Sequence, residues 1–209
     1  MDLFARLEAA GRRWDVLRHP FYRRWECGQL TRQELGVYAG EYHHAVAALA
    51  QAAAQAAPLA GSAHAAEEAD HVELWDAFAE AVGADRKREP LPETRACVEA
   101  WTSAGDPLGA VSVLYAVESA QPEIARTKLA GLVEHYGFSA GSPETTYFTI
   151  HTARDVEHAA HSRRLLEDRA TDGDAARLAS LGEAALKGNW TLLDGVDRAQ
   201  SDGSVKPSA

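Results

Sequence analysis

The chain has 209 residues, of which 46% are hydrophobic, and it carries a formal net charge of −10 at pH 7. This length suits one domain with a sizeable core, and the acidic balance argues against a basic face for nucleic acid. No apolar run approaches the roughly 20 residues that a membrane-spanning helix needs, so we expect no membrane partner.

The predicted elements are all helical, because long Ala-rich and Leu-rich segments contain few Gly or Pro breakers. We expect about seven helices in one domain over residues 1–198, followed by a flexible tail over 199–209. In chain order, the patterns predict helices over 2–18, 35–56, 62–83, 94–104, 108–137, 142–166 and 175–196.

Three local signals mark helix ends or bends. Thr31 and Glu34 form a capping box, and Asp106 before Pro107 matches an N-cap followed by proline in the first turn. Pro122 falls inside the predicted helix 108–137. We expect it to kink that helix, because proline lacks the backbone N–H and crowds the preceding turn.

Only two cysteines occur, Cys27 and Cys97, and they lie far apart in the sequence. This usage fits a reducing compartment without a disulfide framework. The N-terminal segment is amphipathic and charged and lacks the apolar core of a signal peptide. We therefore expect a cytoplasmic protein.

The segment "TIHTARDVEHAAHSRRLL" at 149–166 places His151, Asp155 and His158 at unusual spacing. On one continuous helix, these three side chains leave within a wedge of roughly 60°. Imidazole and carboxylate groups on one face suit a divalent transition metal. The alternative is a solvated helix face or a set of hydrogen-bonded core histidines.

The first half of the chain repeats this spacing in His64, Glu68 and His71. In both halves the preceding helix carries an acid, Glu41 or Glu118, that we expect to face inward. One such stripe could arise by chance, but two with the same spacing favour a metal site over a solvated face.

The donors also match a known type of metal site in helix bundles. Glu68 and His71, like Asp155 and His158, are acid-x2-His pairs, and the preceding helices add single acids. Helix bundles form carboxylate-bridged di-iron or di-manganese sites from such parts. Structural zinc is less expected, because no cysteine cluster accompanies the site. The neighbouring Glu67 points about 100° away from Glu68, so we expect it to be solvated.

Five segments together resemble the haem-oxygenase-like superfamily: "HPFYRRWECGQL", "YAGEYHHAVAAL", "HVELWDAFAEAVG", "YAVESAQPEIARTKLAGLVEHYG" and "YFTIHTARDVEHAAHSRRLL". The resemblance covers about residues 15–195. It is closest to the branch related to thiaminase II (TenA-like) and pyrroloquinoline-quinone synthase (PqqC-like), and within it to the di-iron oxidases. It implies a haem-oxygenase-like helical bundle.

Carried over residue by residue, the resemblance implies metal ligands at Glu68, His71, Glu118, His151, Asp155 and His158. The predicted helix 62–83 is the first that carries ligands, and the position of its acidic ligand is left open. Some members place it seven residues before the histidine, where this chain has His64. His64 and Glu41 remain candidates for an additional ligand or a supporting role. The aromatic residues expected to flank the site as core or pocket wall are Tyr38, Tyr42, Tyr115 and Tyr147.

The resemblance implies an enzyme that holds two iron ions, with manganese as the alternative metal, and uses O2 as co-substrate. The expected reaction is N-oxygenation of an amine, desaturation or oxidative C–C cleavage of a small organic substrate in a biosynthetic pathway. A homodimer is the default expectation for the assembly.

Four other interpretations compete. One is a ferritin-like di-metal bundle, which the extra helices and the "HPFYRRW" segment disfavour. A thiaminase-II-like hydrolase needs an active-site cysteine where this chain has "LYAVESAQ". A metal-free oxidase resembling pyrroloquinoline-quinone synthase leaves the spaced ligands unexplained. A non-catalytic metal-binding or partner-binding protein of the same fold would show no O2 consumption.

Overall fold

The computed structural model describes residues 2–201, and this part of the chain is helical without a strand. It agrees with the all-α prediction, although some predicted helices are divided. The elements are α1 (Leu3–Arg13), η1 (Val16–Arg18), α2 (Pro20–Glu26), α3 (Arg32–Ala60), α4 (Ser62–Ala81), α5 (Pro92–Thr102), α6 (Pro107–Glu118), α7 (Gln121–His135), η2 (Pro143–Thr145), α8 (Thr146–His151), α9 (Arg154–Arg169) and α10 (Ala175–Ser201).

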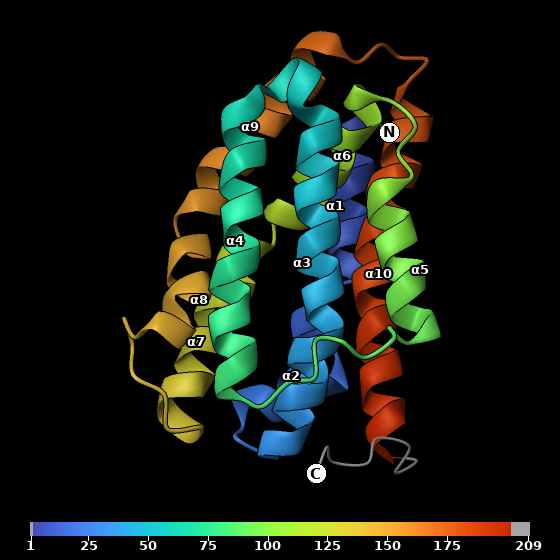
Figure 1. Cartoon of the computed structure of the whole chain (residues 1–209). Coiled ribbons are helices and arrows are strands. Elements are labelled where there is room, and N and C mark those ends of the chain that lie inside the picture. Colours follow the sequence, from blue (N-terminus) through green and yellow to red (C-terminus); the bar gives the residue numbers. More distant parts are fainter. Residues whose placement is uncertain (1, 202–209) are drawn as a thin grey trace.

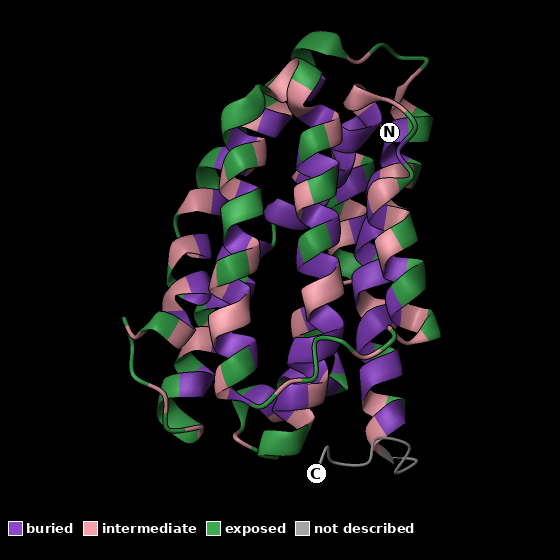
Figure 2. Cartoon of the chain, in the orientation of Figure 1, coloured by how far each residue is buried: buried purple, intermediate pink, exposed green. Residues whose placement is uncertain are grey.

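The long helices form a bundle around α3 (Figure 1). α3 packs against α4, α5 and α6, and α10 packs against α5, α6 and α1. The segment after α9 crosses the top of the bundle in the view of Figure 1 before α10 descends. The buried residues face the interior of the bundle along its whole length (Figure 2).

The two predicted helix caps are confirmed. The side chain of Thr31 accepts a hydrogen bond from the Glu34 N–H, and Glu34 accepts one from the Thr31 N–H, which completes the capping box. Asp106 accepts from the Gly109 N–H at the start of α6, with Pro107 in the first turn. These bonds satisfy N–H groups that the helix itself leaves unpaired.

The predicted kink at Pro122 is wrong, because the chain forms two helices there instead of one bent helix. α6 ends at Glu118 and α7 begins at Gln121. Proline at position 122 has no N–H for the carbonyl of residue 118, and its ring crowds that carbonyl. The break therefore falls directly after Glu118, so this side chain lies at the end of its helix.

The predicted continuous helix through 149–166 is also interrupted, between His151 and Arg154. The Thr152 hydroxyl donates to the Thr149 carbonyl at 2.7 Å, the acceptor that the Ala153 N–H would use in an α-helix. The Ala153 N–H bonds to the Ile150 carbonyl instead. His151 thus ends α8, while Asp155 and His158 occupy the start of α9.

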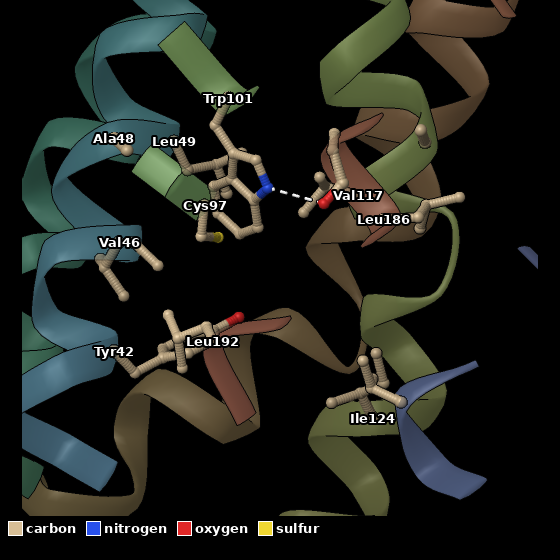
Figure 3. Packing of buried hydrophobic residues seen from close by; sticks show 14 of the residues in the cluster. Tyr42, Val46, Ala48, Leu49, Cys97, Trp101, Val117, Ile124, Leu186 and Leu192 are labelled. Carbon is tan, nitrogen blue, oxygen red and sulfur yellow. Dashed lines mark hydrogen bonds between the residues drawn. The ribbon is translucent and has the colours of Figure 1, made fainter. Parts of the chain in front are cut away.

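The apolar core fills the space between α3, α5, α6 and α10 and is anchored by hydrogen-bonded indoles. Trp101 is fully buried beside Cys97 of the same helix, and its indole N–H donates to the Ala185 carbonyl of α10 at 2.9 Å, on the side where Leu186 lies (Figure 3). A buried indole needs such an acceptor because an unpaired N–H is costly in a dry interior. This packing fixes α3 and α6, against which α4 and α9 pack.

The predicted tail over 199–209 begins within α10, which continues to Ser201, and residues 202–209 lie outside the described part. Among the described helices, none combines the length and apolar character needed to cross a membrane.

Candidate metal centre

Four helices bring seven polar side chains together inside the bundle. All seven are buried, and none is more than 7% exposed. They are His64, Glu68 and His71 of α4, Glu118 of α6, His151 of α8, and Asp155 and His158 of α9. The two stripes predicted from sequence therefore lie in one cluster, and Glu118 joins them from α6.

One group of donors consists of His64, Glu68, Glu118 and His158, each with a ligand atom within 4.8 Å of the others. The His64 Nε2 lies 2.8 Å from Glu118 Oε1 and 3.8 Å from Glu68 Oε1. His158 Nδ1 lies 3.7 Å from the same Glu68 oxygen. Two imidazoles and two carboxylates at this spacing can surround one transition-metal ion.

A second group consists of Glu68, His71 and His151, again with atoms within 4.8 Å of one another. His71 Nδ1 lies 3.1 Å from Glu68 Oε1. Asp155 adds a carboxylate beside the first group, with its Oδ1 3.7 Å from His158 Nδ1. Glu68 belongs to both groups, so its carboxylate would be available to both if each held a metal ion.

The imidazoles are oriented from outside the cluster. His151 Nδ1 lies 2.6 Å from the Tyr147 carbonyl, to which it donates, so Nε2 keeps its lone pair for the interior. His158 is held similarly, with Nε2 3.0 Å from Glu67 Oε2. A ligating histidine commonly donates its other N–H to a carbonyl or carboxylate in this way.

The seven residues fit a metal because their buried atoms lack hydrogen-bond partners. Within the described residues, 15 buried side-chain nitrogen or oxygen atoms have no such partner, and ten of them belong to this cluster. They include both oxygens of Glu118 and of Asp155. Leaving so many polar atoms unpaired is costly in a dry interior, and metal coordination would satisfy them together.

The electrostatics of the cluster follow from burial and crowding of charge. Burial, together with the nearby Glu68 and Asp155 carboxylates, raises the pKa of Glu118 well above its ordinary value. Burial lowers the pKa of His64 and of His151. Such displaced values are typical of functional sites.

For His158, burial lowers the pKa, but the polar contact with the Asp155 carboxylate and the charges of Glu118 and Glu68 outweigh it. The pKa rises to about 9 as a result. Without a metal, both ring nitrogens of His158 are therefore protonated at neutral pH. A metal ion would have to displace that proton to bind.

Aromatic side chains and one lysine lie beside the cluster. Tyr147 stacks on His151 with ring centroids 4.0 Å apart. Lys128 is buried, and its Nζ donates to the Tyr38 hydroxyl at 2.7 Å, which is also 2.7 Å from the Tyr22 hydroxyl. Burial lowers the pKa of Lys128 well below its ordinary value, which favours a neutral amine.

Of the four tyrosines predicted near the site, Tyr115 lies elsewhere. Its ring packs edge-to-face on Phe4 at 5.5 Å, and its hydroxyl accepts from Arg163 at 3.2 Å. Tyr38 and Tyr42, by contrast, pack against each other at 5.3 Å, and Lys128 Nζ lies over both rings. Tyr22 was not predicted, because its segment carries no ligand spacing that would indicate it.

Glu41 is buried, as expected of an inward-facing acid, but it does not join the cluster. Its Oε2 accepts from the Leu91 N–H at 2.9 Å and from the Thr94 hydroxyl at 2.5 Å. The buried carboxylate thus binds the start of α5, where the N-cap residue provides no side-chain cap. The internal repeat places Glu41 and Glu118 on equivalent helices, but only Glu118 reaches the centre.

We expect the Glu41→Ala variant to lose about 1–3 kcal/mol of unfolding free energy, because it leaves buried donors at the start of α5 unpaired. Metal stoichiometry should stay at the wild-type value. Urea unfolding of the metal-free protein and metal analysis of the loaded protein test the two halves of this prediction. A variant that loses metal at unchanged stability would place Glu41 in the centre after all.

Glu67 differs from its expected role as a solvated acid. It is partly exposed, yet it contacts His158 and is bound by Arg154 through two hydrogen bonds. The expectation rested on its angle from Glu68 around α4, and this angle does not reveal that α9 lies beside it.

The fold and the cluster define a class: an all-helical bundle whose interior holds histidines and carboxylates arranged for metal ions. The comparison with known families agrees with this description. The chain belongs to the family of iron-containing redox enzymes, whose model matches residues 61–193, and it is therefore an oxidoreductase.

Curated relatives share most of their length with this chain. It is 32% identical to the 4-aminobenzoate synthase of Chlamydia muridarum, with 93% of this chain and 89% of that protein covered. It is 30% identical to the 4-aminobenzoate synthase of Nitrosomonas europaea, with 87% and 85% covered. Both relatives are named for the synthesis of 4-aminobenzoate.

Solved structures confirm the haem-oxygenase-like fold over the ferritin-like alternative. A domain of unknown function with a haem-oxygenase-like fold from Shewanella denitrificans superposes with a TM-score of 0.78 at 20% identity, covering 100% of this chain and 97% of the other. A TenA homologue from P. horikoshii gives 0.72 at 14% identity, covering 95% and 99%. At these identities the similarity shows the fold alone.

Proposed function

We propose that this oxidoreductase binds two iron ions in the seven-residue cluster and uses O2 to convert a small organic substrate into 4-aminobenzoate. The observation that carries the proposal is Glu68, which belongs to both donor groups and is buried among four imidazoles. When bound, iron supplies O2 activation and electron transfer, which amino-acid side chains do not provide alone.

The residues of the chain have separate tasks in this proposal. Glu68 holds both metal positions together, while His64, Glu118 and His158 complete one and His71 and His151 the other. Asp155 lies next to His158 and is available to either position. The bundle keeps water out, since every one of these side chains is buried.

The choice of product rests on the relatives. Two proteins named 4-aminobenzoate synthase are 30% and 32% identical to this chain over most of both lengths. Of the three expected reactions, N-oxygenation acts on an amine nitrogen, which 4-aminobenzoate carries on its aromatic ring. The protein also places an amine against aromatic rings, the two kinds of group that 4-aminobenzoate combines. The Nζ of the buried Lys128 lies over the rings of Tyr22, Tyr38 and Tyr42.

The experiment is anaerobic loading of the purified protein with Fe(II), addition of a panel of aromatic amines and aromatic amino acids as candidate substrates together with O2 and a reductant, and chromatographic detection of 4-aminobenzoate. The His151→Ala variant is the inactive control. We expect O2 consumption and product in the wild type and neither in the variant. O2 consumption without 4-aminobenzoate would leave an oxidase with another product and contradict the product assignment. No O2 consumption by an iron-loaded protein would contradict the activity itself.

A thiaminase-II-like hydrolase is disfavoured by the state of the cysteines. Cys97 is fully buried in the apolar core, and burial raises the pKa of its thiol far above its ordinary value. Cys27 is exposed at the end of α2. A nucleophilic cysteine needs a lowered pKa and access to substrate, and the buried thiol has neither.

Metal affinity should increase with pH between about 7 and 9. His158, with its pKa raised to about 9, is protonated below that value and must release the proton when a metal binds. Each proton displaced gives roughly a tenfold change in apparent Kd per pH unit, with tighter binding at higher pH. Titration of metal-free protein with Mn²⁺ at several pH values measures this slope. A Kd that does not change over this range would contradict the assignment of His158 as a ligand.

A further inference from the structure

Glu67 contacts the metal centre from the outside, through His158. Its Oε2 lies 3.0 Å from His158 Nε2, while the opposite ring nitrogen, Nδ1, lies 3.7 Å from Glu68 Oε1 and 3.7 Å from Asp155 Oδ1. The imidazole therefore spans the distance from Glu67 to the cluster. Because Glu67 is on the far side of the ring, its carboxylate is not itself among the donors.

Arg154 fixes the position of Glu67. Its Nε donates to Glu67 Oε2 at 3.1 Å and its Nη2 donates to Oε1 at 2.5 Å, a two-point contact that sets the plane of the carboxylate. Arg154 is the first residue of α9, and no side chain caps that helix start. The pair thus ties α4 to the turn of α9 that carries Asp155 and His158.

We infer that Glu67 is a positioning residue of the metal centre: it accepts the Nε2–H of His158 and so keeps the Nδ1 lone pair directed at the metal, with Arg154 holding Glu67 in place. The inference rests on the proposed function. A carboxylate on the second nitrogen of a ligating imidazole fixes its tautomer and raises its basicity. Removing an exposed ion pair without this role would change neither the stability of the fold nor the metal affinity by much.

The test is optical titration of the metal-free full-length protein with Co²⁺. For Glu67→Ala we expect affinity about 10–100-fold weaker than wild type. Glu67→Gln should be the milder change, because its amide oxygen can still accept from Nε2–H. The control is Glu157→Gln, which also alters a partner of Arg154 but has no contact with His158 comparable to that of Glu67. It should titrate as wild type does. Equal affinities for Glu67→Ala and this control would overturn the inference.

A double-mutant cycle separates positioning from a general structural effect. If Glu67 acts through His158, then Glu67→Ala should weaken Co²⁺ binding no further in a His158→Ala background. The same additional loss in that background would overturn the inference. Should Glu67→Ala fail to fold, the Gln variant with and without His158→Ala gives the same comparison.

The tautomer of His158 gives a direct readout. In the protein loaded with Zn²⁺, long-range ¹H–¹⁵N spectra should show Nε2 protonated and Nδ1 metal-bound, and this signature should be lost or mixed in Glu67→Ala. A wild-type spectrum with Nδ1 protonated would overturn the inference while leaving the proposed function intact. A wild type that binds no metal would contradict the proposed function as well, so the two failures are distinguishable.

Discussion

The Glu68→Ala variant is expected to bind no stoichiometric iron and to show no O2-dependent activity. Glu68 is the one residue common to both donor groups found among the described residues, and its Oε1 lies 3.1 Å from His71 Nδ1 and 3.7 Å from His158 Nδ1. Its loss therefore removes a donor from both metal positions and takes away one of the three carboxylates that lie among the buried imidazoles. Iron content after anaerobic loading and desalting is the measurement.

The matched control for that variant is Glu73→Ala, which removes an exposed carboxylate from the same helix. It should load iron as the wild type does. A Glu68→Ala protein that still holds two irons would show that the carboxylate does not bridge the site. Loss of one iron only would assign Glu68 to a single position and contradict its shared role.

Replacing Trp75 with alanine is expected to reduce the unfolding free energy of the metal-free protein by about 3–5 kcal/mol. The indole is fully buried, donates to the Ala39 carbonyl at 2.9 Å, and packs against Tyr147 with ring centroids 4.8 Å apart. The substitution leaves a cavity between α3 and α4 and removes this hydrogen bond. Since Tyr147 stacks on His151, metal affinity should also fall.

Urea unfolding of the metal-free proteins measures this loss without the contribution of bound metal. The control is Trp14→Ala, because Trp14 is only half-buried at the surface and bonds to Glu183. It should lose less than the core variant. Equal losses for the two variants would mean that the aromatic packing beside the centre does not carry the stability assigned to it.

The ligand stripes were predictable because their signal is short-range. His64, Glu68 and His71 lie within about two turns of one helix, so their shared face follows from helical geometry alone. The second stripe was predicted for a continuous helix, yet it reaches the centre across a break. The Thr152 hydroxyl contributes to that break by competing for a backbone acceptor, and this competition depends on the local rotamer.

Residues placed by contacts between helices could not be derived in the same way. Glu41 lies in a sequence pattern similar to that of Glu118, but α5 packs beside it and uses its carboxylate as a cap. Glu67 was expected to face solvent, and only the position of α9 gives it His158 and Arg154 as partners. Sequence spacing could not decide the role of His64, because spacing does not reveal that Glu118 lies 2.8 Å away.

The central claim is that the buried cluster is a di-iron centre, and the number of iron ions that the wild-type chain retains after anaerobic loading tests it most directly. The same measurement is made on Glu68→Ala and Glu73→Ala. We predict about two irons per chain in the wild type and in Glu73→Ala, with none retained stoichiometrically in Glu68→Ala. A wild type without stoichiometric iron, or equal iron in all three proteins, would contradict the claim.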